Sequence, residues 1–249
     1  MVDTHCHLDS IKEPTADVVA RARQAGVARL ATVGMHGESI QRALADAAEH
    51  EGVVAIVGRH PHHSEGFDES ALEEIERAAQ DPNARAIGET GLDYYRDRAP
   101  REDQRRAFEA QLGLAERTGL PVVIHTREAE EDTFAILAER AASLTVILHC
   151  FSAPSRLDEA VERGYLCSFA GNVTYKNATD LQAAARDVPG ELLLVETDSP
   201  YLAPMPMRGK PNEPANVSHT AEFISELRGV RYDELDAVVE ENARRVFRW

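Results

Sequence analysis

Short apolar runs alternate with amphipathic segments along the whole length of this 249-residue chain. Each run is rich in Val, Ile, Leu or Ala and does not alternate strictly between apolar and polar residues. That pattern is typical of parallel strands that are buried on both faces. It predicts eight strands, at residues 2–7, 27–34, 53–58, 84–89, 121–125, 145–149, 165–170 and 192–198.

The segments between the runs carry apolar residues at helical spacing. The segment 101–118, for example, places Phe108, Leu112 and Ala115 on one face and stops before Gly119, and glycine is common just past the end of a helix. The same reasoning predicts further helices at residues 15–24, 39–49, 69–79, 128–141, 156–163, 179–186, 215–227 and 232–246.

Eight strands that alternate with helices in a chain of this length fit an α/β fold of the (β/α)8 type, the TIM barrel. A doubly wound open sheet is the alternative, but it rarely needs eight evenly spaced units, and no G-x-G-x-x-G motif follows the first run. No linker-like or low-complexity stretch interrupts the chain, so we expect a single domain over residues 1–249.

Side chains able to bind metal lie at the ends of the predicted strands. In a barrel these ends converge on one mouth, so residues far apart in sequence are expected to meet there. Imidazoles and carboxylates suit Zn, Mg, Mn or similar divalent metal ions without choosing among them. The donors are too many for one tetrahedral ion and predict two ions bridged by a carboxylate. The predicted ligands are His5, His7, Glu89, His125, His149 and Asp198, with Glu89 as the bridge.

The loop after the last predicted strand carries a second cluster. Barrels often bind phosphate there, and Arg offers forked donors to phosphate oxygens. We therefore expect Arg208, Lys210 and Asn212 to bind substrate, the alternative being a solvated basic loop. Tyr94 and Tyr95 are able to stack on bases, but we interpret them as packing residues.

The composition narrows the cellular setting. With 27 basic and 43 acidic residues the formal net charge is −16, which argues against a broad polyanion-binding surface but not against a metal-lined pocket that binds one phosphate. No apolar run is long enough to cross a membrane, no secretory signal is visible, and three cysteines leave one unpaired. We expect a cytoplasmic protein without an obligate protein partner.

Several segments together resemble the TatD-type metal-dependent deoxyribonucleases, within the amidohydrolase-like barrels. The resemblance covers essentially the whole chain and rests on the sequences VDTHCHLD (2–9), AIGETGLDYY (86–95), LPVVIHTRE (120–128), LHCFS (148–152), VETDSPYL (195–202) and RGKPNEP (208–214).

The resemblance implies a 3′→5′ exodeoxyribonuclease that cleaves single-stranded DNA with a metal-activated water. It assigns His5, His7 and Asp198 to one ion, His125 and His149 to the other, and Glu89 to both. It also implies that His60 or His62 lies near the substrate phosphate and acts in catalysis with Glu89 and Asp198. Some relatives act on RNA or on aminoacyl-tRNA esters, so the partner is nucleic acid, DNA or RNA, with a single-stranded 3′ end.

Two other functions stay open at this point. The same metal centre could hydrolyse a carboxylic ester, as in a D-aminoacyl-tRNA deacylase, or the chain could bind metal without being an enzyme. Related phosphotriesterase-like barrels bridge their metals with a modified lysine, and Glu89 in that place disfavours them.

Overall fold

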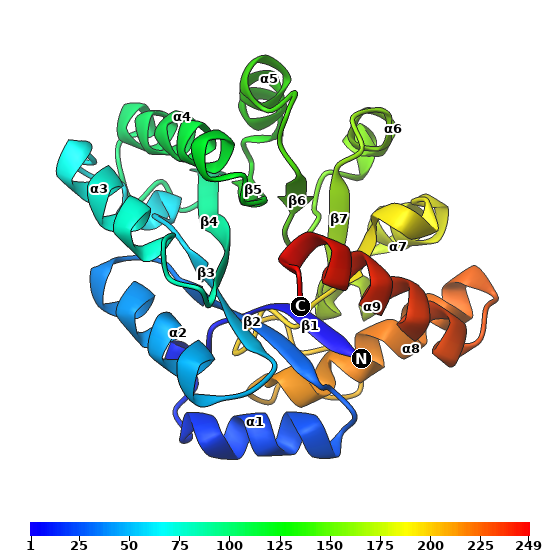
Figure 1. Cartoon of the computed structure of the whole chain (residues 1–249). Helices are drawn as coiled ribbons and strands as arrows, with labels where there is room; N and C mark the ends of the chain where they lie inside the picture. Colours follow the sequence, from blue (N-terminus) through cyan, green and yellow to red (C-terminus); the bar gives the residue numbers. More distant parts are fainter.

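The computed structural model describes residues 1–249 and contains one sheet of eight parallel strands. The strands are hydrogen-bonded in the order in which they occur in the chain, and helices surround them (Figure 1). This order confirms the predicted barrel and excludes the doubly wound sheet, in which the order reverses. The strands are β1 (Val2–Cys6), β2 (Arg29–Gly34), β3 (Val53–Val57), β4 (Ala84–Asp93), β5 (Val122–Arg127), β6 (Val146–Leu148), β7 (Leu166–Phe169) and β8 (Leu193–Val195).

The barrel closes just beyond the carboxyl end of β8. There the chain bridges to β1 between Cys6 and Ser199, and the backbone N–H of His7 donates to Ser199 O at 2.8 Å. The N–H of Asp198 likewise donates to His5 O at 2.9 Å. These bonds set the side chains of the first strand directly beside those that follow the last strand.

Helices follow the strands around the outside of the sheet, and α9 follows α8 directly. The positively charged amino group of Met1 lies 3.2 Å from Asp236 and 3.0 Å from Glu240, so α9 covers the amino end of β1 and leaves the mouth free. None of the helices has the length and apolar character needed to cross a membrane. The helices are α1 (Thr15–Gln24), α2 (Gly37–Glu49), α3 (Glu69–Ala78), α4 (Arg101–Thr118), α5 (Glu130–Arg140), α6 (Leu157–Glu162), α7 (Thr179–Asp187), α8 (Val217–Arg228) and α9 (Tyr232–Phe247).

The apolar faces read from the sequence are the ones that are buried. Phe108 and Leu112 of α4 are at most 1% exposed and belong to one continuous cluster of 64 buried apolar residues. Burial of each such side chain stabilises the fold by about 1.5–3 kcal/mol. The strands contribute both of their faces to this cluster, as expected for a parallel sheet covered by helices.

One strand is longer than predicted. The apolar run stops at Glu89, but β4 continues to Asp93 because Thr90–Asp93 pair in register with Ile124–Arg127 of β5. Gly91 makes this pairing possible: its φ is +139°, and a Cβ atom there would lie 2.0 Å from His125 O. Glu89 therefore lies inside a strand, and its neighbour β5 carries His125.

Candidate metal centre

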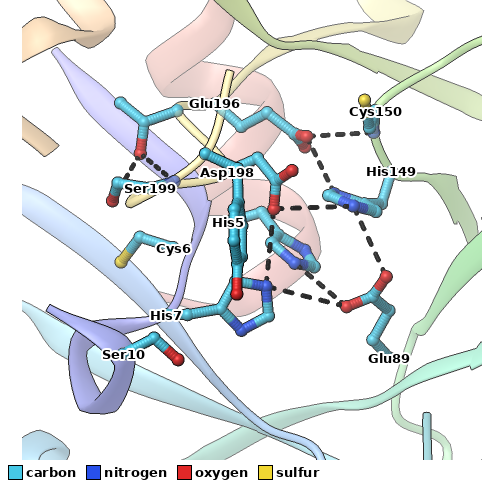
Figure 2. A network of polar contacts seen from close by, with 12 residues as sticks. His5, Cys6, His7, Ser10, Glu89, His149, Cys150, Glu196, Asp198 and Ser199 are labelled. Atoms are coloured by element: carbon cyan, nitrogen blue, oxygen red, sulfur yellow. Dashed lines mark hydrogen bonds and ion pairs between the residues drawn. The ribbon is translucent and has the colours of Figure 1, made fainter. Parts of the chain in front are cut away.

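The mouth of the barrel gathers the six predicted ligands. His5 lies within β1 and His7 just after it, Glu89 and His125 lie within β4 and β5, His149 directly follows β6, and Asp198 lies three residues after the end of β8. Figure 2 shows His5, His7, Glu89, His149 and Asp198 pointing toward one another. His5 is 1% exposed and Glu89 2% exposed, so the cluster is shielded from bulk water.

The carboxylate of Glu89 lies at the centre of this cluster. Its Oε2 atom is 3.4 Å from His5 Nε2 and 3.9 Å from His7 Nε2. Its Oε1 atom is 2.7 Å from His125 Nδ1 and 3.5 Å from His149 Nε2. Each carboxylate oxygen thus faces a different group of imidazoles, which is the arrangement expected of a bridging ligand.

Asp198 approaches both groups. Its Oδ1 atom is 3.4 Å from His7 Nε2 and 4.0 Å from His149 Nε2. The side chain reaches inward from a backbone with φ of +52°.

The hydrogen bonding of the buried imidazole nitrogens shows whether these residues are suited to bind a metal. Both ring nitrogens of His5 are buried and form no hydrogen bond, and the same holds for His7 Nδ1. An unpaired polar atom in the interior is costly unless something satisfies it. Imidazole nitrogen together with carboxylate oxygen is the donor set that divalent transition ions prefer, so the residues present fit such ions.

The ionisation of Glu89 and His5 agrees with that fit. Burial raises the pKa of Glu89, but the neighbouring imidazoles of His149 and His60 outweigh it and hold the pKa well below its usual value, so the group is a carboxylate. Burial and repulsion from His149 lower the pKa of His5, which leaves its ring neutral. A carboxylate and a neutral imidazole are the states in which these groups bind metal.

Two further carboxylates contact the far sides of the imidazoles. Glu196 Oε1 lies 2.8 Å from His149 Nδ1 and accepts the N–H of Cys150 at 2.9 Å. Asp93 Oδ2 lies 3.1 Å from His125 Nε2. Burial lowers the pKa of His149, but the charges of Glu196 and Glu89 outweigh it and raise the pKa to about 10. Such partners fix ring orientation and raise ligand basicity.

Neither Glu196 nor Asp93 was among the residues expected from the sequence to take part in the site. A signal was present for Glu196, which stands two residues before Asp198 and therefore on the same side of an extended chain. For Asp93 the sequence held none, because the predicted strand stopped at Glu89.

The structure distinguishes the two candidate histidines after β3. His60 Nδ1 accepts the N–H of His62 at 3.0 Å, so a neutral His60 carries its proton on Nε2, which lies 3.5 Å from Glu89 Oε1. Burial lowers the pKa of His60 to about 3, which keeps the ring neutral. His62 instead contacts Asp93 Oδ2 at 2.8 Å. His60 therefore presents an N–H donor to the centre, and His62 lies one step farther out.

Of the three residues predicted to bind substrate in the loop after β8, two are exposed and one is buried. Arg208 and Lys210 are exposed, but Asn212 is 1% exposed. The Asn212 amide donates to Thr197 O at 2.9 Å and to Tyr201 O at 2.6 Å, and its oxygen accepts two hydrogen bonds. With all its polar atoms engaged, Asn212 anchors the loop around Asp198 and has none left for substrate, which corrects the role expected for it.

Comparisons with known proteins agree with this geometry. A family model described as TatD related DNase matches residues 2–248. The uncharacterized metal-dependent hydrolase YabD of Bacillus subtilis is 37% identical over 252 residues, covering 100% of this chain and 99% of YabD. The 3′-5′ ssDNA/RNA exonuclease TatD of Pectobacterium carotovorum is 36% identical, covering 93% of this chain and 92% of that protein. The crystal structure of YjjV, a TatD homologue from Escherichia coli, superposes with a TM-score of 0.92 at 29% identity and covers 100% and 98% of the two chains.

Proposed function

Because this chain belongs to the TatD-related DNase family of metal-dependent hydrolases, we propose that it is a 3′→5′ exonuclease that removes nucleotides from single-stranded DNA with two divalent ions. The placement of Glu89 carries the proposal, since its two oxygens face two separate groups of imidazoles. Relatives named as single-stranded DNA and RNA exonucleases support the choice of substrate.

The ligands divide into two sets around Glu89. His5, His7 and Asp198 lie on the Oε2 side, and His125 and His149 lie on the Oε1 side. Ions bound in these two places would lower the pKa of a water molecule from about 15.7 toward 7 and offset the charge of the phosphoryl group.

The residues around the ligands supply the remaining chemistry. Asp198 is the most accessible carboxylate of the centre, with 14% of its side chain exposed, and is placed to accept the proton of the attacking water. The Nε2–H of His60 is placed to donate to a phosphoryl oxygen, where a preorganised donor stabilises developing charge. In-line attack of this water on phosphorus breaks the bond to the 3′ oxygen of the preceding nucleotide. That oxygen takes a proton from solvent and becomes the 3′ hydroxyl of the shortened strand, and a nucleoside 5′-monophosphate is released.

The test starts from protein stripped with EDTA, to which single metals are added back. We expect nuclease activity to return with at least one divalent metal and to shorten 5′-labelled single-stranded DNA progressively from its 3′ end. His149→Ala should lose about 100-fold or more of this activity, because ligand loss removes several kcal/mol of charge stabilisation. The control is His50→Ala, a half-buried histidine just after α2, outside the mouth.

Three outcomes would contradict the proposal. They are digestion from the 5′ end, full activity in a folded His149→Ala variant, and turnover of a D-aminoacyl-tRNA ester without turnover of DNA. The last outcome would assign the same metal centre to ester hydrolysis.

A further inference from the structure

Most basic side chains around the mouth differ from those on the outer helices. The exceptions are Arg59 after β3 and Arg156 after β6, which pair with Glu74 and Glu159. On the helices, many arginines are neutralised by carboxylates, as Arg105 is by Glu109 at 2.9 Å and Arg42 by Asp46 at 3.1 Å. In the segments that end or follow β4, β5, β7 and β8, every Lys and Arg is exposed and forms no ion pair or side-chain hydrogen bond. We call these residues the rim cations: Arg96, Arg98, Arg127, Lys176, Arg208 and Lys210.

The carboxylates of the same segments do not neutralise the rim cations. Asp97 pairs with Arg101 and Glu213 with Arg21, while Glu196 and Asp198 belong to the metal centre. Glu128 is the one carboxylate there without a partner. In a chain of net charge −16, a group of exposed cations without carboxylate partners at the mouth marks it as a place where a polyanion is attracted.

Exposed tyrosines stand among these cations. Tyr95 is 50% exposed, with the guanidinium carbon of Arg127 4.0 Å from its ring centre and that of Arg96 5.2 Å away. Tyr201 is 54% exposed, and its ring centre lies 6.1 Å from that of His7. Aromatic rings interleaved with cations are the surface that unstacked nucleobases bind.

Tyr94 and Tyr95 have different environments, although the sequence predicted both as packing residues. Tyr94 is partly buried, donates its hydroxyl to Asp132 at 2.6 Å and lies under Arg101 at 4.0 Å. Tyr95 makes no such hydrogen bond and leaves half of its surface to solvent. The packing interpretation holds for Tyr94 and is wrong for Tyr95.

The metal centre lies between the two groups of rim residues. In sheet order, β6, which His149 follows, lies between two pairs of strands. On one side, Tyr95 follows β4 and Arg127 ends β5; on the other, Lys176 follows β7 and Arg208 follows β8. A strand that crosses the mouth from one group to the other passes over the ligands.

We propose that Tyr95, Tyr201 and the rim cations form a track that holds several nucleotides of one unpaired strand. Tyr201, beside His7, stacks on the base next to the cleaved bond, and Tyr95 stacks on a base farther along the strand toward its 5′ end. The rim cations bind the phosphates between them. This inference rests on the proposed function, because it assigns the residues by which the same site selects a single-stranded polymer over a short phosphodiester.

A binding assay tests the track under conditions in which the strand is not hydrolysed. Fluorescence anisotropy in EDTA compares a labelled 12-residue deoxythymidine strand with an abasic strand and a duplex of equal length. We expect the thymidine strand to bind more tightly than either, and Tyr95→Ala and Tyr201→Ala each to weaken it about tenfold. Tyr95→Trp should retain tight binding. Arg208→Ala should reduce the magnitude of the slope of log K against log salt by about 0.7.

The control variant is Tyr232→Ala, since Tyr232 is 37% exposed but lies on α9. It should bind the strand as the wild type does. Equal affinity for the abasic and thymidine strands would overturn the track, and so would wild-type affinity in both Tyr95→Ala and Tyr201→Ala.

A hydrolysis assay distinguishes an error in the proposed track from an error in the proposed function. The readout is the ratio of kcat/KM on the 12-residue strand to kcat/KM on bis(4-nitrophenyl) phosphate, which we expect to fall about tenfold in Tyr95→Ala. An unchanged ratio in an active enzyme would overturn the track alone. The opposite result is also possible: the protein binds the strand tightly but hydrolyses neither substrate with any added metal. That result would overturn the proposed function and support the track.

Discussion

At the scale of single residues, the metal centre depends on side chains that do not themselves face the ions. Glu196 holds the outer nitrogen of His149, and Asp93 does the same for His125. An imidazole without such a partner rotates more freely and is less basic, so each carboxylate contributes to metal affinity through its histidine.

Glu196→Gln tests this contribution, because glutamine keeps the shape of the side chain and removes its charge. We expect metal affinity to fall by about 10- to 100-fold, with activity restored at higher metal concentration. Calorimetric titration of the stripped protein measures the affinity. Glu191→Gln, an exposed position near β8, is the matched control. Wild-type affinity in Glu196→Gln would show that the carboxylate has no role in binding.

Single residues also mark where the sequence was insufficient. The six proposed ligands were predictable because each stands at or near the carboxyl end of an apolar run. The role of Asn212 was not, because only the fold shows that its amide is occupied by Thr197 and Tyr201. The exposure of Tyr95 was equally hidden, since a Tyr–Tyr pair reads the same whether a ring is packed or solvated.

At the scale of elements, the positions of most helices and strands follow directly from the apolar periodicity. Two strands are exceptions. β8 ends at Val195, three residues before the predicted end. β4 extends beyond the predicted end, because its last residues include Gly91 and Asp93 and do not form an apolar run. Its extension depends on pairing with β5, a contact between distant segments that periodicity does not report.

Gly91→Ala tests the importance of this close pairing. The new methyl group would meet His125 O, and the backbone would keep a φ of +139° that alanine rarely adopts. We expect a loss of about 1–3 kcal/mol in the free energy of unfolding, measured with urea, together with weaker metal binding because Glu89 and His125 shift apart.

Gly119→Ala is the control for backbone strain alone. Gly119 also has a positive φ, +66°, but nothing lies within 4 Å of the added methyl group. It should lose some stability and keep wild-type metal affinity. If the two variants behave alike in metal binding, the contact between β4 and β5 does not position the ligands.

At the scale of the whole molecule, the barrel explains why residues from both ends of the chain form one site. Parallel strands bring their carboxyl ends to one mouth, and the bridge between Cys6 and Ser199 brings the last segment back to the first. The net charge of −16 is a property of the whole chain, whereas the rim cations give the mouth a local group of positive charges. The sequence could not separate the two, because ion pairing depends on neighbours in space.

The most direct test of this account is the number of ions that one chain binds. Equilibrium dialysis of the stripped protein against Mn²⁺ or Zn²⁺, followed by elemental analysis, counts them. We expect two ions per chain in the wild type and in His50→Ala, and no more than one in Glu89→Gln, because the bridging charge is lost. A wild type that binds a single ion, or a Glu89→Gln variant that still holds two, would contradict the account.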